Sequence, residues 1–182
     1  MGATEWDSGW EYLEKYKELF KRAVFQNVLI ISRSYWDWYV NKLAEFIVFA
    51  HRGTSIPLMQ NELAKLRKIT YQEILEQISI MEKVCKLDFQ VSEEAKQNVK
   101  EMSLVRNLGL HNRWEVDQKY LNRTSKQNQW QIGDVRMFDS KELILWHRNL
   151  IDLINKTCKP VAVRYVSAPK YPVKLFNTPL PF

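Results

Sequence analysis

Residues 35–51, which read YWDWYVNKLAEFIVFAH, decide the fold class of this protein. Wound into a helix, the segment is apolar nearly all round, through Trp36, Trp38, Tyr39, Leu43, Phe46, Ile47 and Phe49. A helix with apolar side chains on most of its surface packs against several neighbours at once. The segment therefore predicts a helix at residues 35–51 that is packed on several sides and ends at Arg52 and Gly53.

The sequence around this segment holds few residues that break helices. Only 5 glycines and 6 prolines occur among 182 residues, and five of the prolines lie at or beyond Pro160. Long helices are expected where turn formers are this scarce. Residues 8–32 are predicted as a first helix, capped by Ser8 and Glu11, and no proline or glycine forces a break after it near Arg33.

The sequence after the central segment predicts a connection and three more helices. Residues 54–68 form the connection, with Pro57 and room for one turn of helix. Capping residues such as Thr70 and Ser92 open the later helices, predicted at residues 71–86, 92–112 and 139–156. The polar stretch 113–138 is expected to include a short extended piece. The predicted fold class is all-α, an up-and-down helical bundle over residues 1–159 followed by an extended basic tail with prolines over residues 160–182.

Length and composition exclude several classes of protein. A chain of 182 residues with 46% hydrophobic and 26% charged residues is typical of a soluble globular fold. No apolar run approaches the ~20 residues of a membrane span, so no membrane partner is expected. The two cysteines cannot make a disulfide framework or a four-ligand zinc site. The first residues lack the pattern of a secretion signal, and a cytoplasmic location is expected.

The net charge of +6 gathers at the C-terminal end of the chain. No acidic residue follows Asp152, whereas several basic ones do, among them Arg164, Lys170 and Lys174. Aromatic residues are interleaved with them, as suits a phosphate backbone with exposed bases. We therefore treat these three basic residues as candidate RNA contacts. The alternative is a solubilising tail that packs its aromatic rings on the body.

One segment brings together residue types that are used in catalysis: VRNLGLHN at residues 105–112, with an arginine, a histidine and two asparagines. Phosphate loops, nucleophile elbows and zinc-binding HExxH motifs are absent from the sequence. At 100° per residue, Arg106 and His111 stand about 140° apart around a helix, and Asn107 lies between them, about 40° from His111. Val105 and Leu108 of the segment, with Met102 and Leu104 before it, are expected on the opposite arc, so the polar triplet is predicted to be displayed. Val99 and Leu110 are expected on the displayed arc too, where they would suit a two-fold contact with a second copy.

Such a triplet could cleave RNA without metal. A neutral imidazole takes the proton of a ribose 2′-hydroxyl, and a guanidinium holds the charge that develops on phosphorus. Asn107 would orient the imidazole or the phosphate. In the alternative, structural interpretation, His111 caps the C-terminus of its helix and Arg106 pairs with Glu101 or Asp117.

Residues 104–121, LVRNLGLHNRWEVDQKYL, resemble the signature segment of the HEPN superfamily, small all-helical domains of prokaryotic toxin–antitoxin and antiviral defence systems. The family pattern is an Arg, usually followed by a polar residue, and a His after four to six intervening positions. Arg106, Asn107 and His111 satisfy it. The similarity continues through Asn112, Val116, Asp117, Tyr120 and Leu121.

The resemblance implies a homodimer whose paired Arg and His residues line one cleft and act as a metal-independent endoribonuclease that leaves a cyclic phosphate. Arg106 would stabilise the transition state, His111 would act as base or acid, and Asn107 would support them, with no cofactor and no metal. An antitoxin, a modifying enzyme or a sensor protein is the expected restraining partner. One departure is Trp114, where family members commonly carry Gly, and a large indole there could narrow the cleft.

Three further residues are expected in supporting roles: Asn112, Asp37 and Tyr120. The resemblance places an acid at Asp37 that would hold Arg106 or His111, or else it is a solvated carboxylate. Tyr120 either reaches the cleft or anchors the turn after the motif. His51 and His147 are expected to be structural. The alternative function is a non-catalytic HEPN domain that serves dimerisation or nucleic-acid binding beside a partner protein.

Overall fold

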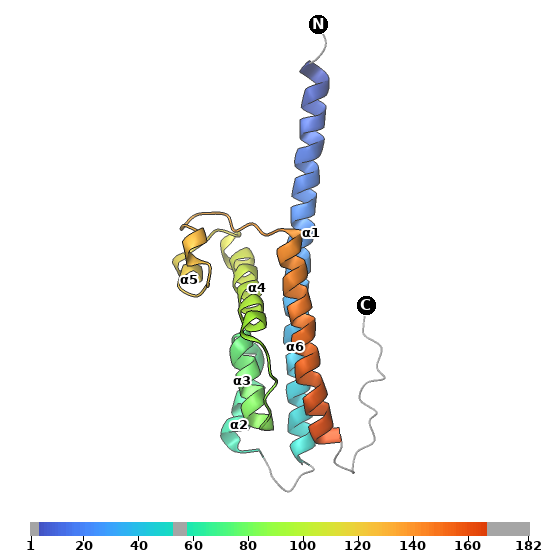
Figure 1. Cartoon of the computed structure of the whole chain (residues 1–182), viewed down its shortest axis with the longest axis vertical. Coiled ribbons are helices and arrows are strands. Elements are labelled where there is room, and N and C mark those ends of the chain that lie inside the picture. The colour runs from blue at the N-terminus through green and yellow to red at the C-terminus, as the bar shows by residue number, and fades with distance from the viewer. Residues whose placement is uncertain (1–3, 53–57, 167–182) are drawn as a thin grey trace. The chain divides into compact units, whose positions relative to one another are not determined.

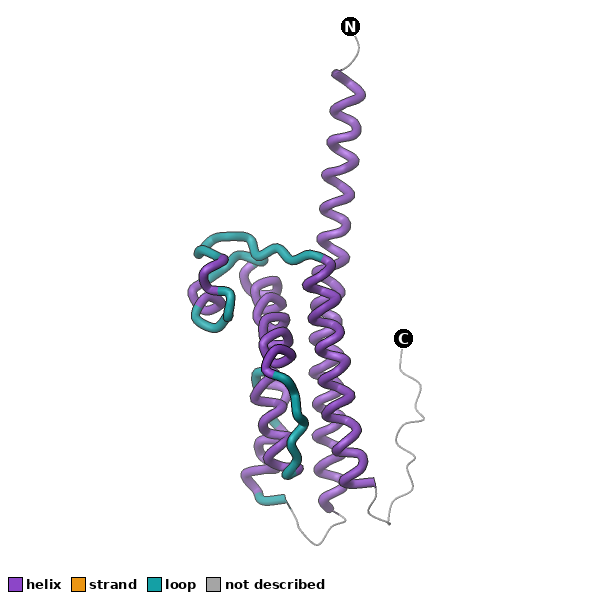
Figure 2. The backbone as a smooth tube through the Cα atoms, viewed as in Figure 1, coloured by secondary structure: helices purple, strands orange, loops and turns teal. Residues whose placement is uncertain are grey.

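The computed structural model of the chain describes residues 4–52 and 58–166. In those residues the fold is all-α, as predicted, and Figure 2 shows it as helices and loops. The α-helices, labelled in Figure 1, are α1 (Thr4–Arg52), α2 (Gln60–Arg67), α3 (Ile74–Cys85), α4 (Glu93–Asn112), α5 (Gln118–Leu121) and α6 (Ser140–Val166). No helix of the described residues is long and apolar enough to cross a membrane.

The chain forms two compact units that share the long helices α1 and α6. The first unit comprises residues 1–36 and 93–150, and the second comprises residues 37–92 and 151–182. In the first unit α1 contacts α4 and α6: Arg33 Nε donates to Ser103 Oγ at 3.4 Å, and Ser32 Oγ lies 3.3 Å from His147 Nδ1. The core of this unit is built from Leu29, Trp36, Val99, Met102, Val105, Leu108, Val116, Trp146 and Leu150, all buried.

The second unit packs α2 and α3 with residues of α1 and α6. Its buried side chains include Val40, Ile47, Leu66, Ile69, Ile78, Met81, Leu153 and Val161. His51 Nε2 lies 2.7 Å from the Tyr165 hydroxyl, so His51 ties two helix ends together, as expected of a structural histidine. Cys85 is wholly buried, and burial raises the pKa of its thiol to about 11.

The two helices predicted at residues 8–32 and 35–51 are one helix, α1. The serines around the expected break bond back along the helix, Ser32 Oγ to Val28 O at 2.8 Å and Ser34 Oγ to Ile30 O at 2.9 Å. Arg33 and Trp36 are buried, so packing holds the helix together here. The helix also begins at Thr4, four residues before Ser8.

The last helix, α6, runs ten residues past its predicted end near residue 156. Residues 160–166 are therefore helical and not part of an extended tail. Pro160 lies inside α6, although it lacks an N–H and usually ends a helix. Val161 and Tyr165 are buried in the second unit, and this burial offsets the lost hydrogen bond.

The remaining boundaries follow the predictions closely, with one wrong cap. α4 matches the predicted 92–112, and the Asp139 carboxylate caps α6 by accepting from Glu142 N at 2.8 Å. Thr70, however, lies in a 3₁₀ turn, Ile69–Tyr71, and α3 starts after Glu73. The extended piece expected in residues 113–138 is a single antiparallel bridge between Glu115 and Val135.

Candidate active site

The predicted polar triplet lies on α4, near its C-terminal end. His111 is exposed, while Arg106 and Asn107 are half-buried. Arg106 Nη1 donates to Asn107 Oδ1 at 3.1 Å, so these two side chains form one polar group. The opposite arc of the helix is in the core, because Met102, Leu104, Val105 and Leu108 are all buried.

Of the two apolar residues expected on the displayed arc, one is exposed and the other is buried. Leu110 is 45% exposed, as predicted. Val99 is fully buried, so its predicted role in a contact between copies is wrong. The angular position of Val99 is shared with Arg106, which lies at the edge of the exposed arc. At Val99, two turns before Arg106, the core of the first unit covers this edge of the helix.

One basic residue near the motif was missed by the sequence analysis. Arg33 of α1 is only 6% exposed, and its Nε donates to Ser103 Oγ, one turn before Arg106 on α4. A buried guanidinium within a helix is unusual, because burial of a charge is costly. The run Ser32-Arg33-Ser34 within an apolar helix was the available signal.

The C-terminal end of α4 is closed by an unusual turn. Arg113 and Trp114 both adopt left-handed backbone conformations, with φ of 50° and 71°. Trp114 is buried, its backbone N–H donates to Leu108 O at 3.1 Å, and its indole covers Gly109. This is the position where the family that the motif resembles commonly has Gly, the residue for which a positive φ carries no strain.

The Trp114 indole is also held from outside α4. Its ring centroid lies 5.8 Å from that of Phe138. With the Gln26 amide turned so that its oxygen faces the donors, Gln26 of α1 accepts from Trp114 Nε1 at 3.0 Å and from Arg22 Nε at 3.1 Å. The end of the motif helix is therefore anchored to α1 and to the segment before α6.

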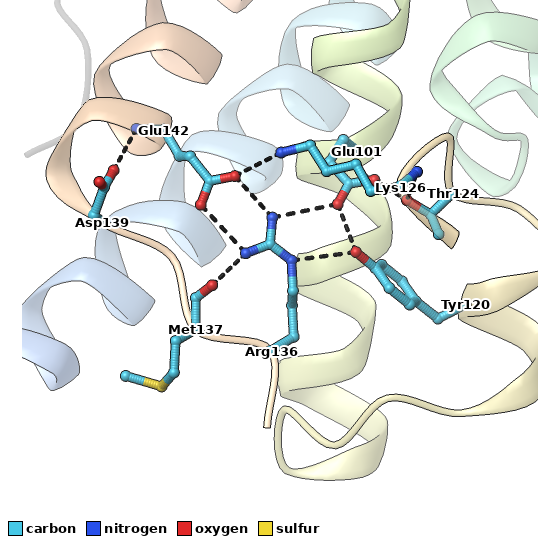
Figure 3. Close-up of polar contacts among 8 residues, drawn as sticks. All are labelled: Glu101, Tyr120, Thr124, Lys126, Arg136, Met137, Asp139 and Glu142. Carbon is cyan, nitrogen blue, oxygen red and sulfur yellow. Dashed lines mark hydrogen bonds and ion pairs between the residues drawn. The ribbon is translucent and has the colours of Figure 1, made fainter. Parts of the chain in front are cut away.

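A buried ion cluster holds the loop that follows the motif, as Figure 3 shows. At its centre Arg136, 2% exposed, donates from Nη2 to Glu101 of α4 at 3.4 Å and to Glu142 of α6 at 2.9 Å. Its Nη1 donates to Glu142 Oε2 at 3.2 Å and to the carbonyl of Met137, and its Nε donates to the Tyr120 hydroxyl at 3.2 Å. All five N–H groups of the guanidinium can thus be used.

The carboxylates of the cluster have further donors. Glu101, buried to 3%, accepts from the Tyr120 hydroxyl and from Thr124 Oγ1, both at 2.6 Å. Glu142 accepts from Lys126 Nζ at 2.7 Å. Two acids and two bases leave the cluster neutral, which is the condition under which buried charges are tolerated.

Burial and these hydrogen bonds shift the pKa values of three groups in the cluster. Burial alone would raise the pKa of Glu142, but the hydrogen bonds from Arg136 and Lys126 lower that pKa below its ordinary value. Burial raises the pKa of the Tyr120 hydroxyl to about 12, and its bond to Glu101 acts in the same direction. Burial opposes the charge of Arg136, yet the bonds to Glu142 and Tyr120 raise its pKa overall.

The other predicted supporting residues have structural partners. Tyr120 anchors the turn after the motif through the ion cluster, and Asn112 Nδ2 donates to Glu115 O at 2.6 Å. Asp37 belongs to the second unit, where it accepts from Gln77 Nε2 at 3.3 Å. The acids considered as partners of Arg106 also have other contacts, since Glu101 lies in the cluster and Asp117 caps α5 by accepting from Tyr120 N at 2.7 Å.

The predicted RNA contacts of the tail have different outcomes. Lys170 and Lys174 lie outside the described residues. Arg164 is exposed within α6. In the described residues, no group of three His, Cys, Asp or Glu side chains could hold a metal ion.

A hollow of about 400 Å³ lies in the first unit between α1 and the segment before α6. Its lining includes three basic residues, two acids and two aromatic rings: Lys15, Lys21, Arg22, Glu18, Asp139, Phe25 and Phe138. Cations beside aromatic rings are suited to a phosphate with a stacked base. No local pattern in the sequence marks this surface, because its two walls are more than a hundred residues apart in the chain.

Comparison of the chain with models of protein families, with curated proteins and with solved structures finds no match.

Proposed function

We propose that this protein is a metal-independent endoribonuclease of the HEPN type, a toxin or defence effector whose site forms between two copies of the chain. The observation that carries the proposal is the exposed end of α4, where His111 is accessible and Arg106 is joined to Asn107 by a 3.1 Å hydrogen bond. These groups lie on a helix whose other side is core. An imidazole and a guanidinium on a rigid support suit general acid–base cleavage of a phosphodiester.

The need for a second copy follows from helix geometry. Arg106 and His111 are five positions apart. This separation is about 7.5 Å along the helix axis and about 140° around it. The two side chains of one copy therefore diverge. A two-fold contact near Leu110, 45% exposed, would bring His111 of one copy toward Arg106 of the other.

The proposed reaction needs only these side chains. His111 takes the proton of the ribose 2′-hydroxyl, the 2′-oxygen bonds to phosphorus, and the bond from phosphorus to the 5′-oxygen breaks. The imidazolium form of His111 then returns a proton to the 5′-oxygen. Arg106 stabilises the extra negative charge on the phosphate, and the products are a 2′,3′-cyclic phosphate and a 5′-hydroxyl.

Rigid support of the motif adds to the proposal. The indole of Trp114 covers Gly109 near the end of α4, and the ion cluster around Arg136 holds α4 at Glu101, near its middle. A catalytic group gains from such support because small displacements are costly in rate. The basic hollow that Lys15 and Arg22 line would contact the RNA beyond the cleaved bond.

The test is incubation of the purified protein with total cellular RNA in excess chelator. Wild type should cleave and leave cyclic-phosphate ends, and His111→Ala should lose about 10²- to 10⁴-fold in rate. Arg106→Ala should lose cleavage as well. Lys119→Ala is the matched control, since Lys119 is exposed just after the motif, and it should cleave like wild type. Equal cleavage by wild type and His111→Ala would contradict the assigned site.

A second candidate is a non-catalytic HEPN-type module for dimerisation or nucleic-acid binding beside a partner protein. The hydrogen bond between Arg106 and Asn107 favours it, because each side chain then satisfies the other within one helix. This candidate predicts no cleavage by any of the four forms in the same assay, while wild type still binds RNA.

A further inference from the structure

The N-terminal part of α1 presents large apolar side chains to solvent. Among the described side chains of this helix, none from Tyr12 to Val28 is buried, and the first buried one is Leu29. Phe20 is 73% exposed and Tyr16 is 64% exposed. Monomeric proteins rarely leave an apolar surface of this extent uncovered.

The exposed residues form a regular stripe along one side of α1. Its members, here called the α1 stripe, are Leu13, Tyr16, Phe20, Val24, Val28, Ile31 and Tyr35. They follow one another at steps of 3, 4, 4, 4, 3 and 4 residues. Leu29, Ser32 and Trp36, which face the core of the first unit, lie on the opposite arc. The six steps span 22 residues and average about 3.67 residues, the spacing of an 11-residue repeat, which favours pairing with a right-handed supercoil.

We propose that the α1 stripe pairs with the same stripe of a second copy as a parallel two-stranded coiled coil. The area is adequate: the exposed parts of the seven side chains amount to roughly 700 Å² per copy, close to the ~800 Å² per partner of a stable interface. A self-complementary stripe on a two-fold axis needs no other protein.

The charges beside the stripe favour the parallel arrangement. Lys17 and Lys21 flank it on one side, whereas Leu19 and Ala23 flank it on the other. In a parallel pair, the lysine side of one helix meets the uncharged side of its partner, where the lysine stems can cover apolar surface. Glu14 and Glu18 lie on the same side and pair with these lysines, Lys17 with Glu14 at 3.2 Å and Lys21 with Glu18 at 3.6 Å.

The first test measures mass in solution by light scattering. In a Leu110→Glu background, which removes the contact proposed for α4, the protein should still have twice the chain mass of 21.8 kDa, and adding Tyr16→Glu/Phe20→Glu should give the mass of one chain. Ile132→Glu is the matched control, because Ile132 is 64% exposed on a loop of the same unit. Circular dichroism should show the bundle still folded, since neither altered residue touches the core. A monomeric Leu110→Glu form, or a form with all three glutamates that stays dimeric, would overturn the proposal.

The second test probes orientation. In a parallel pair the two copies of residue 16 face each other, so oxidised Tyr16→Cys should form a disulfide-linked dimer. Lys15→Cys, on another side of the helix, and wild type, with Cys85 buried and Cys158 half-buried, should not. A dimer without the link at residue 16 would overturn the parallel arrangement. Both tests are independent of the proposed nuclease, because the first is made without its α4 contact and the second reads a link at residue 16, which lies on α1.

Discussion

The indole of Trp114 lies so close over Gly109 that a Cβ on residue 109 would come within 2.3 Å of its Cζ2 atom. Glycine inside a helix ordinarily weakens it. Gly109 lies between Arg106 and His111 in the sequence. Its missing side chain leaves room for the Trp114 indole, which covers the end of the motif helix. A residue that looks like a weak point of α4 is therefore part of its anchoring.

We expect Gly109→Ala to destabilise the protein by about 1–3 kcal/mol, because the added methyl overpacks against the indole. In a Trp114→Ala background the clash is absent, and the same change should stabilise by about 0.5–1 kcal/mol through helix propensity. Urea unfolding of the four forms gives both values. Stabilisation by Gly109→Ala in the wild-type background would show that the ring does not press on this position.

Replacement of Arg136 by Met should cost about 3–5 kcal/mol in the free energy of unfolding, because Glu101 would be left buried without a counter-ion. Adding Glu101→Gln should recover part of that loss. The control is Lys126→Met, whose partly exposed ion pair with Glu142 should contribute about 1 kcal/mol or less. If the Arg136 and Lys126 variants lost equal stability, the cluster would not be organised around Arg136.

The pH dependence of stability should contain a contribution from Glu142. Its pKa is lower in the folded state than its ordinary value of 4.5, so the folded state binds the proton less readily than the unfolded chain. The stabilisation is complete above that value and is lost as the pH falls through the folded pKa. Urea unfolding at several values between pH 7 and 3 should show a smaller loss on acidification for Glu142→Gln than for wild type. Equal losses would contradict the role of the carboxylate.

Mixing two inactive variants tests the composite site. If Arg106 and His111 of one site come from different copies, a mixture of Arg106→Ala and His111→Ala protein contains mixed dimers with one intact site each. Random exchange of subunits should restore roughly a quarter of wild-type cleavage. Each variant alone is the control, and both should stay inactive. A mixture as inactive as its components would indicate that each site needs both residues from both copies.

Helix periods and end signals were readable from the sequence alone. The scarcity of glycine and proline predicted the all-α class, and Ser92 and Asp139 marked the starts of α4 and α6 to within one residue. The 100° period also placed Leu108 in the core and His111 on the surface. These features depend on interactions within a few residues, which is why a single sequence determines them.

The rest depended on contacts between distant residues. Arg136 and Glu101 are both polar and thirty-five residues apart, so no local pattern marks them as a buried pair. Val99 was expected on the surface and lies in the core, because a helical period gives an angle but not what packs against it. α6 continues through Pro160 since burial of Val161 outweighs a local stop signal. The sequence determined the helices and the motif, and tertiary packing decided which of their faces are covered.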